Sequence, residues 1–267
     1  MSGSDETASA LFRAGKLDAA ISAAQAAVRK APTDLNARVL LGELLIFAGN
    51  LERADVVLDA ASAIDPSTAL VVAEFRQLIR ADMARRQLFR DGRVPEFLGE
   101  PTETQQLQLA ALVALRAGDM AEAARQSEAA EGVRPHAAGR HADVAFDDMR
   151  DADDLLAGSF EVLTTTGKYF WIPAERVETL EFHAPKRPRD LLWRRASMSV
   201  SDGPDGEVYL PVVYASDETL SEALRLGRET DWRQGDGGPV RGVGQRLFVL
   251  GEDAVAIMDL GNLRFDA

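Results

Sequence analysis

Apolar positions in the first half of the chain recur with the spacing of amphipathic helices, and the pattern repeats. The stretch LFRAGKLDAAISAAQAAVRKAP, ending at Pro32, aligns with LIFAGNLERADVVLDAASAIDP, ending at Pro66. Gly15 and Gly49 lie 34 residues apart, and so do the two prolines. A glycine ends a helix where positive φ is favourable, and a proline stops the next helix because its nitrogen carries no hydrogen. The pattern predicts pairs of antiparallel helices.

A third copy, LVALRAGDMAEAARQSEAAEGVRP, has its glycine at Gly118 and ends at Pro135. The stretch between, about 70–101, begins as a long helix and then breaks down, although LFRDGR at 88–93 resembles LFRAGK at 11–16. A period of 34 residues is typical of tetratricopeptide hairpins. Stacked hairpins leave a concave surface that often binds a peptide or helix, so we expect these repeats to bind a protein; the alternative is a scaffold alone.

The second half alternates apolar and polar positions in the manner of strands, in FEVLTTTGKYFWIP, SMSVSD, EVYLPVVY and QRLFVLG. SDGPDGE at 201–207 predicts the turn of a hairpin. One helix is predicted at 216–228, with Ser216 as its N-cap. The expected fold of this half is α+β with a mainly antiparallel sheet.

The fold class is therefore two-domain: tetratricopeptide-like helical repeats in residues 1–140 and a β-rich α+β domain in residues 155–267. Between them, residues 141–154 read HADVAFDDMRDADD, with six aspartates. We expect this stretch to be an acidic linker or the start of a helix. Irregular spacing and the lack of an EF-hand pattern argue against a metal site there.

Composition excludes several classes of function. The formal net charge of -13 makes a nucleic acid a poor partner. There is no cysteine, and the scattered His136, His141 and His183 do not suggest a zinc site. No apolar run is long enough for a membrane span, and the N-terminus does not resemble a secretory signal. A soluble cytoplasmic protein without cofactor or metal is expected.

The most unusual stretch is DWRQGDGGPVRGVGQR at 231–246, which combines five glycines with a tryptophan and three arginines. One interpretation is structural: Asp231 and Asp236 pair with arginines, and Trp232 anchors the loop on the sheet. The other is a protein-binding loop, because Trp and Arg dominate interface hot spots. The candidate residues for either role are Trp232, Arg233, Asp236, Arg241 and Arg246.

Signals for catalysis are weak. No G-x-S-x-G occurs, and the glycine run at 235–244 is followed by a strand-like segment and lacks a Walker lysine. We therefore expect a non-enzyme with no catalytic residues. The alternative is an enzyme whose anion-binding site contains Arg233, Arg241 and Arg246 with the two aspartates of the same loop.

The ordered motifs YFWIPAERVETLEFHAPKRPRDLLWRRA, VYLPVVY, LRLGRETDW and DGGPVRGVGQRLFVLGED resemble the ImpE family, also called TagJ. With the helical repeats before them, the resemblance covers nearly the whole chain. It implies an accessory protein of a bacterial type VI secretion system, without catalysis. It further implies binding to a helix near the N-terminus of the small subunit of the contractile sheath, and an indirect link to the ATPase that disassembles the sheath.

Overall fold

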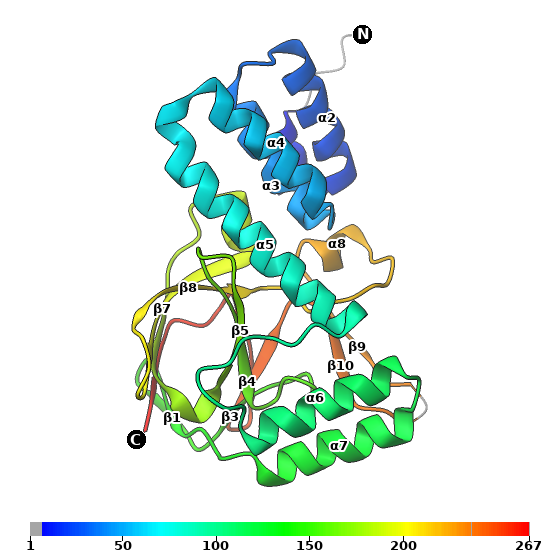
Figure 1. Cartoon of the computed structure of the whole chain (residues 1–267), viewed down its shortest axis with the longest axis vertical. Helices are drawn as coiled ribbons and strands as arrows, with labels where there is room; N and C mark the ends of the chain where they lie inside the picture. Colours follow the sequence, from blue (N-terminus) through cyan, green and yellow to red (C-terminus); the bar gives the residue numbers. More distant parts are fainter. Residues whose placement is uncertain (1–6, 236, 267) are drawn as a thin grey trace.

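Helices occupy the first half of the chain and strands the second, as the periodicities predict. The computed structural model describes residues 7–235 and 237–266. Its N-terminal helices fill one end of the molecule, the strands lie in the middle, and a further helical hairpin lies at the opposite end (Figure 1). The longer helices are α1 Ala8–Arg13, α2 Leu17–Lys30, α3 Leu35–Phe47, α4 Leu51–Ile64, α5 Ala69–Asp91, α6 Glu103–Arg116 and α7 Met120–Val133.

The repeat positions behave as predicted. Gly15, Gly49 and Gly118 have φ angles of 82°, 75° and 78°, so each ends its helix in the left-handed region. Ala20 and Ala54, which are equivalent in the first two copies, are fully buried. Their small side chains let the second helix of each pair pack closely on the first.

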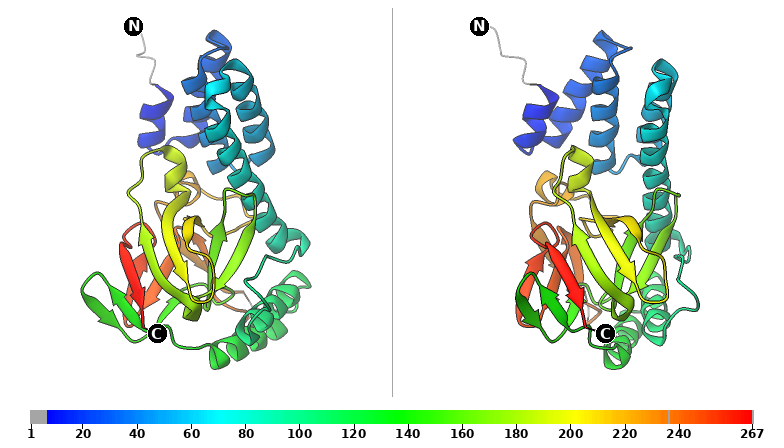
Figure 2. Two further views of the ribbon diagram at one scale, coloured as in Figure 1. Left: turned by 60° about the vertical axis from the view of Figure 1, so that its left-hand side comes forward. Right: turned by 90° about the vertical axis from the view of Figure 1, so that its left-hand side faces the viewer.

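The third hairpin forms, but it does not continue the stack. After α5 the chain runs extended, and Glu96 pairs with the sheet: its N–H donates to Tyr169 O at 2.9 Å, and its carbonyl accepts from Trp171 N at 3.1 Å. This detour carries α6 and α7 to the far end of the molecule (Figure 2). The degenerate repeat thus supplies one long helix and a sheet-edge segment in place of a second hairpin.

The strands form one large antiparallel sheet and two small ones. The large sheet has the order β2-β1-β13-β6-β7-β8-β4-β5; the others are β12-β11-β3 and β10-β9. The predicted hairpin joins β7 to β8 through the turn at 201–205. The strands are β1 Gly139–His141, β2 Val144–Phe146, β3 Met149–Asp151, β4 Ser159–Leu163, β5 Tyr169–Pro173, β6 Val177–Phe182, β7 Trp193–Val200, β8 Gly206–Pro211, β9 Thr230–Arg233, β10 Arg241–Gly244, β11 Leu247–Leu250, β12 Asp253–Ala256 and β13 Asn262–Phe265.

The prediction of a linker or helix start at 141–154 is wrong. This stretch contains the end of β1 and all of β2 and β3, and it is part of the sheets. The many aspartates suggested a solvated segment, but two of them are buried: Asp151 and Asp153 are 2% and 1% exposed. Arginines and backbone N–H groups from distant segments satisfy them, which composition alone does not reveal.

The predicted helix at 216–228 is much shorter in the structure. Only α8, Glu222–Arg225, is helical, and its N-cap is Ser221, whose side chain accepts from Leu224 N at 3.3 Å. The hydroxyl of Ser216 instead accepts from Glu218 N at 3.1 Å, which closes a local turn. Both serines have the N-cap chemistry, so the sequence pattern did not separate them.

The two halves share a hydrophobic core. Phe75 and Leu78 of α5 belong to the same buried cluster as Trp171 and Trp193 of the sheet. The rings of Phe75 and Trp193 meet edge to face, with centroids 6.0 Å apart. Helix α5 therefore belongs to both halves.

Candidate functional site

The stretch at 231–246 folds as a two-stranded ribbon, β9 and β10, with Trp232 opposite Gly242. Trp232 is 39% exposed, and its ring lies 6.2 Å from that of Tyr214. A Cβ at Gly242 would lie 2.1 Å from the Tyr214 ring, so only glycine lets the ribbon approach that ring. Trp232 is thus a partly exposed side chain lying against Tyr214 and not a buried anchor.

Arg233 lies on the surface of this ribbon. It pairs with Asp231, as the structural interpretation predicts, and its Nε is 3.1 Å from Glu218. Both carboxylates are largely exposed, so solvent screens these pairs and they contribute little stability. Asp236 lies outside the described residues.

Arg246 is buried, and among the described residues it pairs with carboxylates from outside its own loop. Its Nη1 is 2.9 Å from Asp151 at the end of β3, and its Nη2 pairs with Glu161 of β4. Its guanidinium also lies 5.2 Å from the centroid of the Tyr214 ring. The stretch is pinned to the sheet, as the structural interpretation predicts, but by carboxylates from elsewhere in the chain.

Arg85 of α5 extends this buried ionic network into the helical half. Its Nε and Nη2 form a bidentate pair with Glu161 at 2.8 and 2.9 Å, and Nη2 also donates to Val213 O at 3.0 Å. The hydroxyl of Tyr169 donates to the same Glu161. Glu161 therefore joins α5, β4, β5 and the start of β11.

The network shifts the pKa values of two carboxyl groups, Glu161 and Asp151, in opposite directions. Burial raises the pKa of Glu161, but the guanidiniums of Arg85 and Arg246 outweigh burial and hold that pKa at about 2. Burial raises the pKa of Asp151 to about 7, against the attraction of Arg246 and with the added repulsion of Asp153. Glu161 is ionised at neutral pH, and Asp151 titrates there.

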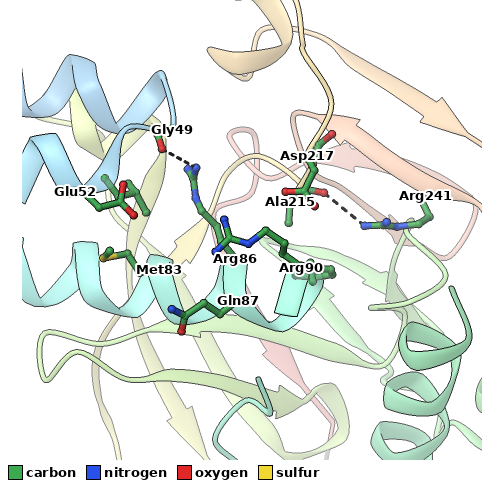
Figure 3. A pocket seen from close by; sticks show the side chains of 12 residues that line it. Gly49, Glu52, Met83, Arg86, Gln87, Arg90, Ala215, Asp217 and Arg241 are labelled. Atoms are coloured by element: carbon green, nitrogen blue, oxygen red, sulfur yellow. Dashed lines mark hydrogen bonds between the residues drawn. The ribbon is translucent and has the colours of Figure 1, made fainter. Parts of the chain in front are cut away.

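Of the three arginines in the stretch, Arg241 is the one that lines a hollow (Figure 3). Its guanidinium lies over the ring of Phe89 of α5, 5.6 Å from the centroid. Arg233 points to the surface and Arg246 into the buried network. The three arginine side chains therefore do not converge on one shared anion site.

A second hollow, which we call the repeat groove, lies on the N-terminal helices and has a volume of about 620 Å³. Alanines of α2 and Leu40 of α3 form much of its wall. Leu40 also lines an adjoining hollow of about 390 Å³, together with Arg13, Lys186 and Arg187. The groove is thus mainly apolar, although Lys30, Asp34 and Asn36 also line it, and it adjoins a basic hollow at Leu40.

A Ser–His–Glu cluster, formed by His183 directly after β6, Ser197 of β7 and Glu207 of β8, has the wrong geometry for a catalytic triad. Nε2 of His183 faces both Ser197 Oγ at 3.1 Å and Glu207 Oε1 at 3.3 Å. A triad needs the carboxylate on Nδ1, opposite the nitrogen that meets the serine. Within residues 7–235 and 237–266, no group of three or more metal-ligating side chains is close enough to hold a metal.

Comparison with known proteins shows to which family the chain belongs. A family model described as ImpE protein matches residues 143–264, and a tetratricopeptide repeat model matches residues 11–73. The chain is 35% identical over 259 residues to the type VI secretion system accessory component TagJ of Pseudomonas aeruginosa. The aligned region covers 96% of this chain and 90% of that protein. The chain belongs to the ImpE/TagJ family.

A crystal structure of a Vibrio parahaemolyticus protein has the same fold as this ImpE/TagJ chain, with a TM-score of 0.92. The two are 28% identical, and the match covers 97% of each chain. In the part of this family member that the structure describes, no helix is long and apolar enough to cross a membrane.

Sequence reasoning missed the partners that define the buried network in this ImpE/TagJ protein. Arg85 and Glu161 are 3% and 0% exposed, yet both lie in stretches read as ordinary helix and strand. One signal was present: Arg85 lies six to seven residues after Leu78 and Ile79, on the apolar face of α5. A charged residue on such a face indicates a buried partner but does not identify it.

Proposed function

We propose that this protein is a non-catalytic adaptor of a type VI secretion system in the bacterial cytoplasm. In this proposal it binds a helix of the small subunit of the contractile sheath and thereby modulates sheath assembly. An effect on the ATPase that recycles the sheath would be indirect. The family relationship and the repeat groove support the proposal.

The repeat groove is the observation that carries it. Ala26 and Ala27 are exposed, while Ala23 and Leu40 are half-buried. Small side chains let the backbone of a docked helix come close, and Leu40 offers an apolar contact between its turns. The volume of about 620 Å³ suits a row of apolar side chains from one face of an amphipathic helix.

The basic residues beside the groove suggest which way the partner helix lies. Arg13, Lys186 and Arg187 line the adjoining hollow, although the chain as a whole is acidic. A helix with acidic residues at one end would place them here, because opposite charges attract and set the orientation of docking.

The test is binding of the full chain to a labelled peptide from the N-terminal helix of the sheath small subunit. Ala27→Arg should weaken binding by about tenfold or more, because the longer side chain fills the groove. The matched control is Val113→Arg on α6, where the native side chain is 57% exposed and far from the groove. Circular dichroism should show that both variants keep the native fold.

The proposal fails if the peptide does not bind at micromolar concentrations. If Ala27→Arg and Val113→Arg both bind the peptide as tightly as the native chain, the repeat groove is not the binding site.

A further inference from the structure

Two hollows adjoin where the helical repeats meet the β-rich half, and we call them together the junction hollow. Their volumes are about 200 and 310 Å³, and Gly49, Arg86, Ala215, Ser216 and Asp217 line both. One wall comes from the α3–α4 turn and α5, and the other from the segment after β8 and from β10 (Figure 3). This size is within the range of small-molecule sites.

Arginines predominate among the charged side chains of the junction hollow. The basic lining residues are Arg85, Arg86, Arg90, Arg225 and Arg241, and the acidic ones are Glu52, Asp217 and Glu218. In a chain with a formal net charge of -13, an excess of guanidinium groups in one hollow is a local exception. Arg85, Arg90 and Arg225 are paired with Glu161, Asp91 and Asp18, so attraction for an anion rests on Arg86 and Arg241.

Two of these arginines have donors to spare. Arg241 makes only a long hydrogen bond, from Nη2 to Ala215 O at 3.5 Å, and its nearest carboxylate, of Asp153, is 3.8 Å from Nε. Its Nε is buried without a hydrogen-bond partner among the described residues. Arg86 donates from Nε to Asp82 and from Nη1 to Gly49 O, which leaves Nη2 without a bond of its own in the described chain. A buried guanidinium donor without a partner, such as Nε of Arg241, is costly unless a ligand completes it, whereas the Arg86 side chain is 38% exposed and its spare donor can also face water.

The hollow of about 310 Å³ also has apolar residues on its wall, among polar and charged ones. Ile46, Leu192, Val213 and Leu220 line it, beside the ring of Tyr214. A ligand with an apolar body could lie here while its charged group faces Arg86 and Arg241, which approach from opposite sides in Figure 3.

We propose that the junction hollow binds a small organic anion, whose phosphate or carboxylate group is held by Arg86 and Arg241 and whose body packs on the apolar wall. Because the walls come from both halves of the chain, the bound anion joins the helical repeats to the β-rich half and stabilises the folded state. This site is separate from the repeat groove, so the proposal does not depend on binding of a sheath helix.

The experiment is isothermal titration of the full chain, together with thermal melts. Phenyl phosphate and benzoate present the two anionic groups on one apolar ring, inorganic phosphate lacks the ring, and benzyl alcohol lacks the charge. We expect one of the two aromatic anions to bind and raise the melting temperature, and the comparison between them identifies the preferred group. Inorganic phosphate should bind more weakly, and benzyl alcohol should not bind.

Arg241→Gln should weaken binding of the preferred anion by about tenfold, the loss of one charge-assisted pair. Arg233→Gln, in the same ribbon but on the surface, is the control and should bind like the native chain. A native melting profile of Arg241→Gln without ligand establishes that it is folded. If that variant is unstable, Arg86→Gln, whose native side chain is 38% exposed, replaces it and should also weaken binding.

Three results would overturn the proposal. One is the absence of binding by either aromatic anion at concentrations up to about 10 mM. Another is equal binding by native and arginine-substituted chains. The third is equal binding by benzyl alcohol, which would show an apolar site without anion recognition. Binding of the sheath peptide, measured on the same preparations, reports separately on the adaptor function.

Discussion

Two residues of one short stretch, Trp232 and Arg246, show how little residue type alone says about environment. The tryptophan is 39% exposed, whereas the arginine is 1% exposed. Arg246 is tolerated inside because two carboxylates and an aromatic ring surround its guanidinium. Trp232 stays near the surface because the ribbon places it across from Gly242, over the edge of the sheet.

Replacing Trp232 by alanine should therefore cost little stability, about 1 kcal/mol, because much of the ring already contacts water. The matched control is Trp171→Ala. Trp171 is fully buried and donates from Nε1 to the hydroxyl of Tyr169, so its loss should cost about 3–5 kcal/mol. Urea unfolding of the two variants measures both values. A loss at Trp232 as large as that at Trp171 would contradict the exposed position of its ring.

At the scale of elements, α5 does more than the repeat pattern predicted. Its repeat face packs on α4, and its other face carries Arg85 into the sheet. The helices themselves were predictable, because glycine and proline recur with apolar residues in register. Strand β3 was not, because its Asp151 is satisfied by Arg246 and Tyr214, which lie far away in the chain. The short α8 was not, because Ser216 and Ser221 offer the same N-cap chemistry and each makes a local hydrogen bond. The residues of the 231–246 stretch remain candidate site residues, and the sequence did not reveal which side chains Arg241 and Arg246 contact.

The ionic network between α5 and the strands should make stability depend on pH. The pKa of Asp151 is about 7 in the folded protein and about 4 in an unfolded chain. Between about pH 4 and pH 7 the folded state thus holds a proton that the unfolded state has lost, and the resulting stabilisation is complete below about pH 4. The contribution is lost as pH rises to about 7 and is constant above that. Glu161 contributes with the opposite sign, since its pKa falls from about 4.5 in the unfolded chain to about 2 in the folded protein, but this contribution changes only below about pH 5.

Asp151→Asn should flatten this dependence, since the amide mimics the protonated carboxyl. Between about pH 5 and 8, the native chain should lose about 2 kcal/mol more unfolding free energy than the variant. Urea titrations at several pH values measure this difference. Asp143→Asn, at an exposed position of the same acidic stretch, is the control and should follow the native curve. Parallel curves for Asp151→Asn and the native chain would show that Asp151 does not carry the effect.

At the scale of the whole molecule, the helical repeats and the β-rich half are joined by a common core and by the ionic network. The core cluster contains Phe12, Leu44 and Phe75 from the helices as well as Trp193 and Leu226 from the second half. Contacts at the surface add to this: Arg228 donates to Phe12 O at 2.9 Å, and Arg225 to Asp18 at 3.0 Å. A fragment ending near residue 140 would expose the sheet-facing side of α5, so the halves are not expected to fold as independent units.

Unfolding should therefore be a single cooperative transition. The chain offers two probes for this, because all three tryptophans lie in the second half and most helical residues lie in the first. Far-ultraviolet circular dichroism follows the helices, and tryptophan fluorescence follows the β-rich half. We expect the two urea curves to share one midpoint and one slope. Arg85→Met removes the ion pair between α5 and Glu161 and should lower the free energy of unfolding by about 3–5 kcal/mol. Both midpoints should therefore move together to a lower urea concentration. If the helical signal were lost at a lower urea concentration than the fluorescence signal, the shared core would not couple the halves, and the repeats would act as a separate unit.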